Sequence, residues 1–455
     1  MPVEFVDEKP QAALPVYLVG KDGLKDLPLA PAAMGWATAN GFSAEAGRTL
    51  LLPGEDGAVA GALFGIGDGE SVLGMGALAR ALPEGDWHFA SKARHPDLAA
   101  LALVLGGYVF TRYGKKPGKA LRFALPEGAD GAHVGRIADG VFLARDLVNT
   151  PTNDMGPDEL EEAARKLAAA HGADISVTRG DDLLARNFPM IHAVGRASAG
   201  APRLIDISWG LRDAPKVTLV GKGVCFDTGG LDIKPSAGML LMKKDMGGAA
   251  NVLGLASMIM AAKLNVRLRV LIPAVENSIA GNAFRPGDVL RSRKGIMVEI
   301  GNTDAEGRLI LADALALADE EQPALLVDMA TLTGAARVAL GPDLPPFYTG
   351  DETLASELAA ASVAVEDPLW RMPLWRPYDA KLSSKIADIN NVTTDGFAGS
   401  ITAALFLKRF VEKTPGWAHF DIFGWNPADR PYGLTGGEAQ GIRALERVIA
   451  GRFGV

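Results

Sequence analysis

"KVTLVG", residues 216–221, is a short apolar run that ends in glycine, and two further runs follow it closely. The longer run "GGAANVLGLASMIMAAK" at 247–263 indicates a helix, and "VRLRVLIPAV" at 266–275 is again short and rich in β-branched residues, as strands are. A strand, a helix and another strand in this order predict a largely parallel or mixed sheet that is covered by helices.

The same alternation extends in both directions along the chain. Further strand-like runs are "PVYLV" at 15–19, "KALRFAL" at 119–125, "LIDISW" at 204–209, "IMVEIG" at 296–301 and "ALLVDMATL" at 324–332. Helices are predicted at 133–148 and at 157–172, where proline begins the run, acids fill the first turn and glycine follows the end. The fold class is therefore α/β.

A break in this pattern marks the predicted domain boundary. At 455 residues the chain is too long for one ordinary core. Prolines, asparagines and glycine interrupt all periodicity in "NTPTNDMGPDEL" at 149–160. We therefore expect a smaller N-terminal α/β domain at 1–149 and a larger domain at 150–455.

Composition limits the possible partners and location. A net charge of −8 argues against a general binder of nucleic acid or of anionic membranes. The longest apolar run, 98–110, is too short to cross a bilayer and favours a buried helix. The N-terminus is acidic and broken by proline, unlike a signal peptide, and the single cysteine, Cys225, has no partner for an internal disulfide. A cytoplasmic protein is expected.

The stretch "NTDAEGR" at 302–308 places polar residues at alternate positions before an apolar helical run. In an extended segment Asn302, Asp304, Glu306 and Arg308 would project from one face, so two carboxylates would converge on one centre. An Asx turn at Asp304 followed by a helix start that favours Glu306 is the alternative. Arg308 at the start of a buried helix would prepare an anion site.

A second polar stretch, 220–251, begins where a strand ends, which is where ligand sites of open α/β sheets gather. Asp227 is either a turn aspartate or a ligand, and Asp245 either caps the next helix or joins the same site. Lys222 and Lys234 are solvated lysines on the simpler interpretation, and Cys225 is a small buried side chain.

The combination favours a metal centre. Asp227, Asp245, Asp304 and Glu306 all lie at strand ends or helix starts, and four carboxylates brought together would repel one another unless cations neutralise them. Two divalent ions about 3.5–4 Å apart, bridged by carboxylates, would answer this need.

These motifs resemble those of the leucyl (cytosol) aminopeptidases, the M17 family of dinuclear-metal peptidases. The resemblance rests on "NTDAEGR", on "GKGVCFDTGG", "IKPS" and "MKKDMGGAA" between 221 and 250, on "DMATLTGA" at 328–335, and on "GSITAALFLKRFV" and "WAHFDI" nearer the C-terminus. It covers most of the second domain. It implies a metal-dependent hydrolase that releases N-terminal residues from short peptides, a macrodomain-like first domain and a homohexamer.

The resemblance also implies a role for each residue of the site. One Zn²⁺ or Mn²⁺ ion would be bound by Asp227, Asp304 and Glu306, and a second by Lys222, Asp227, Asp245 and Glu306. Lys234 would polarise the scissile carbonyl, and Arg308 would hold a bicarbonate ion that moves protons. Met242, Asn302, Thr331 and Gly334 would contact the substrate, and the first of its residues would be apolar, such as leucine.

A second hypothesis is a DNA-binding or scaffolding protein that kept the fold and lost the chemistry. Its support is a basic cluster formed by Arg112, Lys115, Lys116, Lys119 and Arg122, which is otherwise a solvated loop. The acidic overall charge weakens this hypothesis. None of the ligand positions departs from the family pattern, which favours the enzyme. His419, beside a family-like motif, is expected to be structural.

Overall fold

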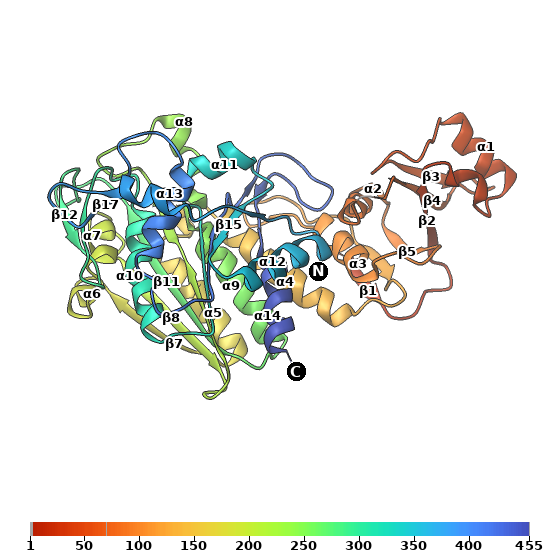
Figure 1. The fold of residues 1–455 in the computed structure, drawn as a ribbon. Helices are drawn as coiled ribbons and strands as arrows, with labels where there is room; N and C mark the ends of the chain where they lie inside the picture. The colour runs from red at the N-terminus through yellow and green to blue at the C-terminus, as the bar shows by residue number, and fades with distance from the viewer. Residues whose placement is uncertain (1–2, 70, 455) are drawn as a thin grey trace. The chain divides into compact units, whose positions relative to one another are not determined.

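The computed structural model describes residues 3–69 and 71–454. The chain divides into two compact units, of which the smaller runs up to Ala138 and includes Asn426–Gly436. The larger unit holds Asp139–Trp425 and the residues from Gly437 onward. The division falls within helix α4 (Gly131–Asn149) (Figure 1).

The smaller unit contains a six-stranded sheet in the order β1-β6-β5-β2-β4-β3. All neighbours are parallel except β3 and β4. Its strands are β1 (Val3–Val6), β2 (Leu14–Gly20), β3 (Thr49–Pro53), β4 (Val59–Gly67), β5 (Gly85–Phe89) and β6 (Leu121–Ala124), and its helices are η1 (Gly23–Asp26), α1 (Pro31–Ala39), η2 (Leu73–Ala77), α2 (Leu78–Ala81) and α3 (Pro96–Gly106). The apolar run at 98–110 was predicted to be a buried helix, and α3 confirms this because its residues from Ala99 to Gly106 are buried.

The larger unit is built on a nine-stranded mixed sheet in the order β16-β15-β18-β14-β9-β11-β8-β7, with β10 beside β11. The strands from β18 to β11 are parallel, whereas β15, β8 and β7 each run antiparallel to a neighbour. Its strands are β7 (Asp174–Arg179), β8 (Arg203–Gly210), β9 (Lys216–Gly221), β10 (Gly223–Asp227), β11 (Arg267–Asn277), β14 (Leu325–Ala330), β15 (Pro346–Thr349), β16 (Trp370–Arg371) and β18 (Trp417–Asp421).

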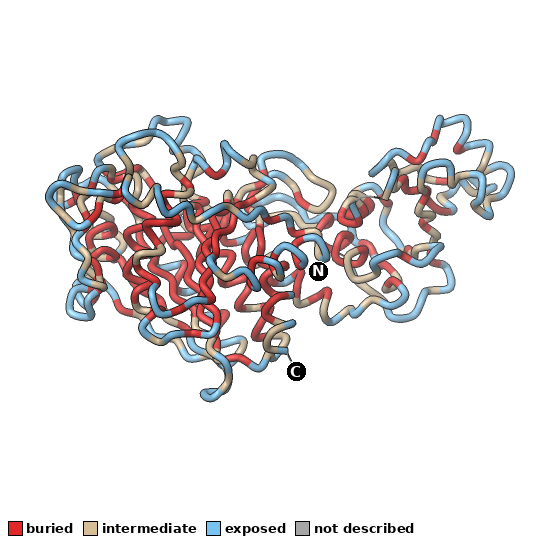
Figure 2. The backbone as a smooth tube through the Cα atoms, in the orientation of Figure 1, coloured by how far each residue is buried: buried red, intermediate tan, exposed pale blue. Residues whose placement is uncertain are grey.

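Helices cover both faces of this sheet. On β9, Val220 packs in the apolar cluster that contains much of α10 (Gly307–Glu320), whereas a side chain on the adjacent Gly221 would meet Ala249 of α9 (Gly247–Ala261). Successive strand residues point to opposite faces, so α9 and α10 lie on opposite sides. Helix α9 packs with α5 (Pro157–His171) and α14 (Ile442–Phe453), and α10 with α7 (Pro189–Gly195) and α13 (Gly399–Lys408). The buried residues in Figure 2 follow the sheet and these helices. The expected two-domain α/β fold is thus confirmed.

The remaining elements form the loops and edges. The larger unit's other helices are η3 (Thr152–Asp154), α5 (Pro157–His171), α6 (Asp182–Ala185), α7 (Pro189–Gly195), α8 (Ser236–Met239), η4 (Met242–Met246), α9 (Gly247–Ala261), α10 (Gly307–Glu320), α11 (Gly334–Leu340), α12 (Glu352–Ala364), η5 (Arg376–Leu382), α13 (Gly399–Lys408) and α14 (Ile442–Phe453). Two small sheets hold β12 (Val289–Arg291), β13 (Met297–Glu299) and β17 (Ile389–Asn390), and β19 (Trp425–Asn426) with β20 (Gly436–Gly437). Among the described residues, no helix combines the length and apolarity that crossing a membrane requires.

Two predicted elements illustrate what local pattern decides. Helix α5 begins at Pro157, the Glu159 side chain accepts a hydrogen bond from Gly156 N at 3.0 Å, and Gly172 ends the helix at a φ of 65°. These start and stop signals are local, and the prediction of this helix is confirmed. By contrast, "IMVEIG" forms only the three-residue β13, which pairs outside the main sheet because its neighbours are β12 and β17.

Candidate metal centre

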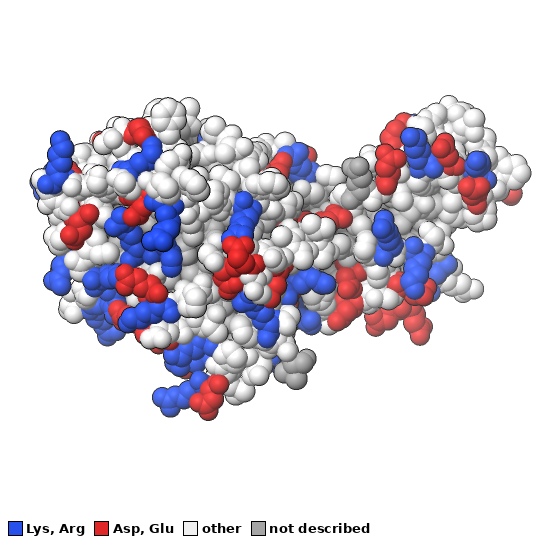
Figure 3. Space-filling view, in the orientation of Figure 1, with Lys and Arg blue, Asp and Glu red and all other residues white. Residues whose placement is uncertain are grey.

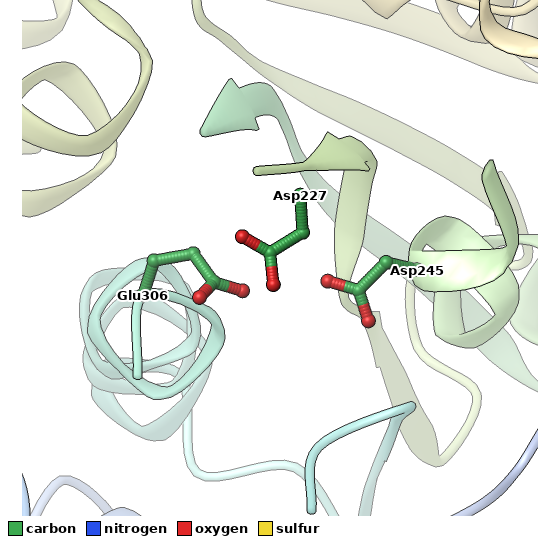
Figure 4. Close-up of side chains that lie close together, drawn as sticks. All are labelled: Asp227, Asp245 and Glu306. Atoms are coloured by element: carbon green, nitrogen blue, oxygen red, sulfur yellow. The ribbon is translucent and has the colours of Figure 1, made fainter. Parts of the chain in front are cut away.

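Three buried carboxylates meet at one edge of the large sheet. Asp227 ends β10, Asp245 lies in η4 and Glu306 directly precedes α10. One carboxylate oxygen from each lies within 4.8 Å of the others, and none of the three residues is more than 3% exposed. Figure 4 shows the three side chains pointing toward a common space. The sequence placed these residues in one site, and the structure brings them together.

Close backbone packing makes this convergence possible. A Cβ atom on Gly248, in the first turn of α9, would lie 2.1 Å from the carbonyl oxygen of Met329 in β14. A Cβ atom on Gly307 would lie 2.3 Å from Cε of Lys222. Glycine therefore allows α9 to start against the sheet and allows the Lys222 side chain to pass the start of α10.

Lys222 lies among these carboxylates. Its Nζ is 2.7 Å from Oδ2 of Asp245 and 3.1 Å from Oε1 of Glu306, and it donates a hydrogen bond to the carbonyl oxygen of Thr331 at 3.0 Å. Burial alone would lower the pKa of Lys222, but Asp245, Glu306 and Asp227 outweigh burial and raise it. The neighbouring carboxylates therefore keep Lys222 as a charged ammonium.

Lys234 joins the fourth carboxylate to the cluster. Its Nζ is 2.9 Å from Oδ2 of Asp227 and also forms an ion pair with Oδ1 of Asp304. Burial opposes the charge of Lys234, yet Asp227 and Asp304 raise its pKa. Burial and the charge of Asp227 raise the pKa of Asp304 to about 6. Asp304 is therefore linked to the centre through Lys234 and is more exposed than the other three carboxylates.

The "NTDAEGR" segment is a turn, and the extended conformation proposed for it is wrong. The backbone N–H of Asp304 donates to Oδ1 of Asn302 at 2.6 Å, which makes an Asx-type turn at Asn302 rather than at Asp304. Glu306 then lies at the N-cap position of α10 with helical φ and ψ. The carboxylates converge because a turn leads into a helix, as the alternative interpretation had it, and not because of strand alternation.

The charges of the site fit a divalent cation. Among the described residues, the four carboxylates form ion pairs only with Lys222 and Lys234. Burial and the neighbouring carboxylates raise the pKa of Glu306 well above its usual value, and its buried Oε2 has no hydrogen-bond partner among the described residues. A buried carboxylate oxygen without a partner is costly, and divalent cations take such oxygens as ligands. The donor set of carboxylates and one amine therefore fits a metal site.

Arg308 is the second residue of α10 and is 8% exposed. Its Nη1 donates to the carbonyl oxygen of Asn391 at 2.6 Å, while the buried Nε has no partner in the part of the chain that the structure describes. Burial lowers the pKa of Arg308 to about 10, so the guanidinium remains charged at neutral pH. A buried guanidinium with an unused N–H is able to bind a small anion.

Three of the four predicted substrate-contacting residues lie around one loop. Thr331 donates from Oγ1 to Oδ1 of Asp245 at 2.8 Å, which places the 331–334 loop against the carboxylate cluster. Gly334 begins α11 at the end of this loop, and Met242 begins η4, the element that carries Asp245. Asn302 is engaged in the turn before α10.

Two residues that support the site were not singled out from the sequence. Asn277 ends β11 and donates from Nδ2 to Oδ1 of Asp227 at 2.9 Å. Asp421 ends β18, and its Oδ1 accepts hydrogen bonds from the N–H groups of Leu332 and Thr333 at 3.1 and 3.0 Å. Polar residues at the ends of otherwise apolar strands were the available signal.

Other singled-out residues lie outside this centre. His419 is fully buried, and its Nδ1 is 2.6 Å from Oδ1 of Asp328, which supports a structural role. Cys225 is buried and unpaired. In the basic cluster, Arg122 pairs with Asp86 at 3.1 Å and Lys119 donates to backbone carbonyls. Figure 3 shows basic and acidic side chains interspersed on the face in view.

Known proteins share this fold and these motifs. The model of the cytosol aminopeptidase family, catalytic domain, matches residues 142–446, and that of the M17 aminopeptidase N-terminal domain matches residues 14–126. The probable cytosol aminopeptidase of Roseiflexus castenholzii (strain DSM 13941 / HLO8) is 45% identical over 335 residues, or 72% of this chain and 68% of that protein.

Two solved structures extend the similarity over nearly the whole chain. The crystal structure of cytosol aminopeptidase from Coxiella burnetii is 46% identical with a TM-score of 0.94 and covers 99% of both chains. The bottromycin maturation enzyme BotP in complex with Mn is 33% identical with a TM-score of 0.88 and covers 97% of this chain and 99% of BotP.

This chain therefore belongs to the M17 cytosol aminopeptidase family. It is a hydrolase of the metallo-aminopeptidase class, as the motifs predicted. The acidic cluster is consistent with the metal dependence of this family.

Proposed function

We propose that the protein removes the N-terminal residue from short peptides by hydrolysis at a centre of two divalent ions. The observation that carries the two-ion proposal is the set of buried carboxylates of Asp227, Asp245 and Glu306, with Asp304 beside them and only Lys222 and Lys234 to offset their charge. Two divalent ions would supply the positive charge that this set lacks.

The ligand groups divide between the two ions. Asp227, Asp304 and Glu306 would hold one ion, and Lys222, Asp227, Asp245 and Glu306 the other. Zn²⁺ or Mn²⁺, when bound, would lower the pKa of a water molecule and polarise the scissile carbonyl. Lys222 binds a cation only as the neutral amine, so its proton must leave the site when the ion enters.

Lys234 would turn from the carboxylates toward the substrate. In the metal-free arrangement its ammonium bridges Asp227 and Asp304. Once cations neutralise those carboxylates, the ammonium would be available to donate to the scissile carbonyl oxygen as negative charge develops there. The role of Lys234 is thus proposed from its position beside Asp227 and Asp304 and from its positive charge.

Arg308 would hold a small anion, proposed to be bicarbonate, with its unused Nε–H. Such an anion beside the cluster would accept a proton from the attacking water and return it to the leaving amine. Met242, Asn302, Thr331 and Gly334 would surround the first residue of the peptide, whose free amine lies at the cluster. An apolar first residue such as leucine suits Met242 and the small Gly334.

The experiment is hydrolysis of leucine amide and of N-acetyl-leucine amide by protein reconstituted with Mn²⁺ or Zn²⁺. The expected outcome is turnover of the free-amine substrate alone, with two metal ions per chain by elemental analysis. Equal turnover of the acetylated substrate would contradict an aminopeptidase, and full activity with one ion per chain would contradict the two-ion centre.

We also propose a cytoplasmic homohexamer, on the resemblance to the family. The short-peptide preference follows if the active sites of such an assembly face an enclosed interior. Light scattering at micromolar concentration is expected to give the mass of six chains. A monomeric mass would refute the assembly without affecting the proposal for the metal centre.

A further inference from the structure

Two cations share one aromatic ring beside the metal centre. Lys244 Nζ lies 4.8 Å from the centroid of the Phe423 ring, and Arg337 Cζ lies 5.0 Å from the same centroid. Lys244 is only 6% exposed, whereas Arg337 lies on the exposed surface of α11. Within residues 3–69 and 71–454, neither side chain has a carboxylate partner within 4.0 Å or donates a hydrogen bond.

Most other buried cations of the larger unit are paired with carboxylates, whereas Arg308 donates instead to the carbonyl oxygen of Asn391. Each of the following has at least one carboxylate partner: Lys222 with Asp245 and Glu306, Arg145 with Glu438, Arg203 with Asp158 and Glu161, and Arg443 with Asp367. A buried ammonium costs several kcal/mol unless an anion compensates it, and one aromatic face offsets only about 1–2 kcal/mol of that cost. The buried Lys244 therefore lacks a compensating anion, and the exposed Arg337 is a second cation on the same ring.

The cation pair lies around the same loop as the predicted substrate contacts. Lys244 directly precedes Asp245, whose carboxylate accepts from Thr331 Oγ1 at 2.8 Å. Arg337 lies in α11, three residues after Gly334 at the start of that helix. Phe423 lies two residues after Asp421, which holds the N–H groups of the 331–334 loop.

A peptide offers two carboxylates to such a cation pair: the side chain of an acidic first residue and the C-terminus. If the proposed function holds, the free amine of the first residue lies at the metal cluster, and its side chain is then at a constant distance from the 331–334 loop. The C-terminus moves with peptide length. Lys244 is buried at a fixed position, so it suits the side-chain carboxylate of the first residue better than a C-terminus whose position varies.

We propose that Lys244 and Arg337 bind the side-chain carboxylate of an N-terminal Glu or Asp residue. This inference rests on the proposed function and extends its substrates from apolar to acidic first residues. Phe423 holds the two cations apart and covers the methylene groups of the bound side chain. A site built to pair a charge rejects the neutral isostere, because the buried cation is then left without its partner.

The test compares glutamyl, glutaminyl and leucyl p-nitroanilides, none of which has a C-terminal carboxylate. The wild-type protein, reconstituted with Mn²⁺, is expected to show kcat/KM for the glutamyl substrate at least about tenfold above that for the glutaminyl substrate. Lys244→Met and Arg337→Met remove the charge and leave an unbranched, apolar side chain. Both are expected to bring this ratio close to one while leaving the value for the leucyl substrate within about threefold of wild type.

The matched control is Lys243→Met. Lys243 is the neighbour of Lys244, but it donates to the carbonyl oxygen of Asn149 at 2.7 Å and lies over the ring of Trp425 instead. Its loss is expected to leave the ratio between glutamyl and glutaminyl substrates unchanged. Arg337→Glu, on the exposed helix surface, provides a variant whose folding is little affected and is expected to place the ratio below one.

The outcomes separate this inference from the proposed function. The inference alone is overturned if the wild type hydrolyses the leucyl substrate but does not prefer the glutamyl over the glutaminyl substrate. It is also overturned if this preference survives in Lys244→Met and Arg337→Glu. If the variants instead lose only a preference for leucyl-glycine over its C-terminal amide, the cations bind the C-terminus and the inference is wrong. No turnover of any substrate by the metal-loaded protein overturns both proposals.

Discussion

Two clusters of buried charge in the larger unit differ in how fully their charges are paired. Around Glu161 of α5, Arg165 and Arg179 donate to the carboxylate at 2.8 Å, and Arg203 does the same while also reaching Asp158 at 2.6 Å. Around Glu306, four carboxylates share two lysines.

The pKa values record this difference. Burial acts to raise the pKa of Glu161, but the surrounding arginines outweigh burial and lower it to about 2. Burial raises the pKa of Glu306, and the neighbouring carboxylates raise it further. One cluster is a completed ion network that holds α5 to β7 and β8. The other lacks positive charge, which is the signature of a binding site rather than of a structural ion network.

The largest expected difference between the clusters concerns metal removal. Prolonged chelation should abolish hydrolysis and lower the melting temperature, because the carboxylates lose the cations that offset their repulsion. Adding Mn²⁺ or Zn²⁺ should restore both, as measured by leucine amide hydrolysis and calorimetry. An exhaustively stripped protein that works at the original rate would disprove the need for metal.

Asp304→Asn keeps nearly the same shape and removes one charge from the cluster. We expect weaker metal retention and a loss of kcat above about 10³-fold, since a ligand and not only a donor is changed. Elemental analysis beside steady-state kinetics measures both. Normal metal content with normal turnover would exclude Asp304 as a ligand.

Lys234→Ala should separate catalysis from metal binding. Because this ammonium is assigned to the substrate carbonyl, the variant should retain its metals and lose roughly 10²–10³ in kcat, as expected for one oxyanion-stabilising donor. The same two measurements apply. Loss of the metals from this variant, with Asp304→Asn retaining them, would reverse the two assigned roles.

Glu161→Gln tests the completed network through its pH dependence. The folded pKa of about 2 lies below the usual value of 4.5, so the stabilisation is fully present above pH 4.5 and is lost as the pH falls through 2. The variant should lose about 3 kcal/mol of unfolding free energy at pH 7 and progressively less below pH 4.5. Urea unfolding of the metal-free proteins measures this, with the exposed neighbour Glu162→Gln as the control. A deficit that is independent of pH would show that charge is not the cause.

Arg308→Ala should have the smallest effect of these changes on hydrolysis. Water or bulk bicarbonate would partly replace the anion that Arg308 is proposed to position, so the loss in kcat should be about tenfold or less. Added bicarbonate should raise the rate of the wild type more than that of the variant. An equal response of both proteins would argue against an anion at Arg308.

The sequence alone determined the class of fold and the type of chemistry, because both depend on local order along the chain. Alternation of apolar runs predicted the mixed sheet and its helices, and the proline, acidic and glycine signals around α5 predicted its bounds. Carboxylates and lysines at strand ends and helix starts predicted a metal site. The order of residues in these motifs also led to the family whose catalytic-domain model matches residues 142–446.

Only the tertiary structure decided how those residues meet. The 302–306 segment is a turn rather than an extended strand, and the distant Asn391 holds it by donating from Nδ2 to the carbonyl oxygen of Asn302. β13 pairs outside the main sheet because its neighbours are β12 and β17, and such packing outweighs local propensity. Asn277 and Asp421 each hold part of the site across 50 or more positions of sequence, as the Asn277–Asp227 and Asp421–Leu332 hydrogen bonds show. The unpaired cations on Phe423 come from segments far apart in the chain. Contacts of this kind depend on which strand ends and helix starts share one edge of the sheet, and no local pattern records that arrangement.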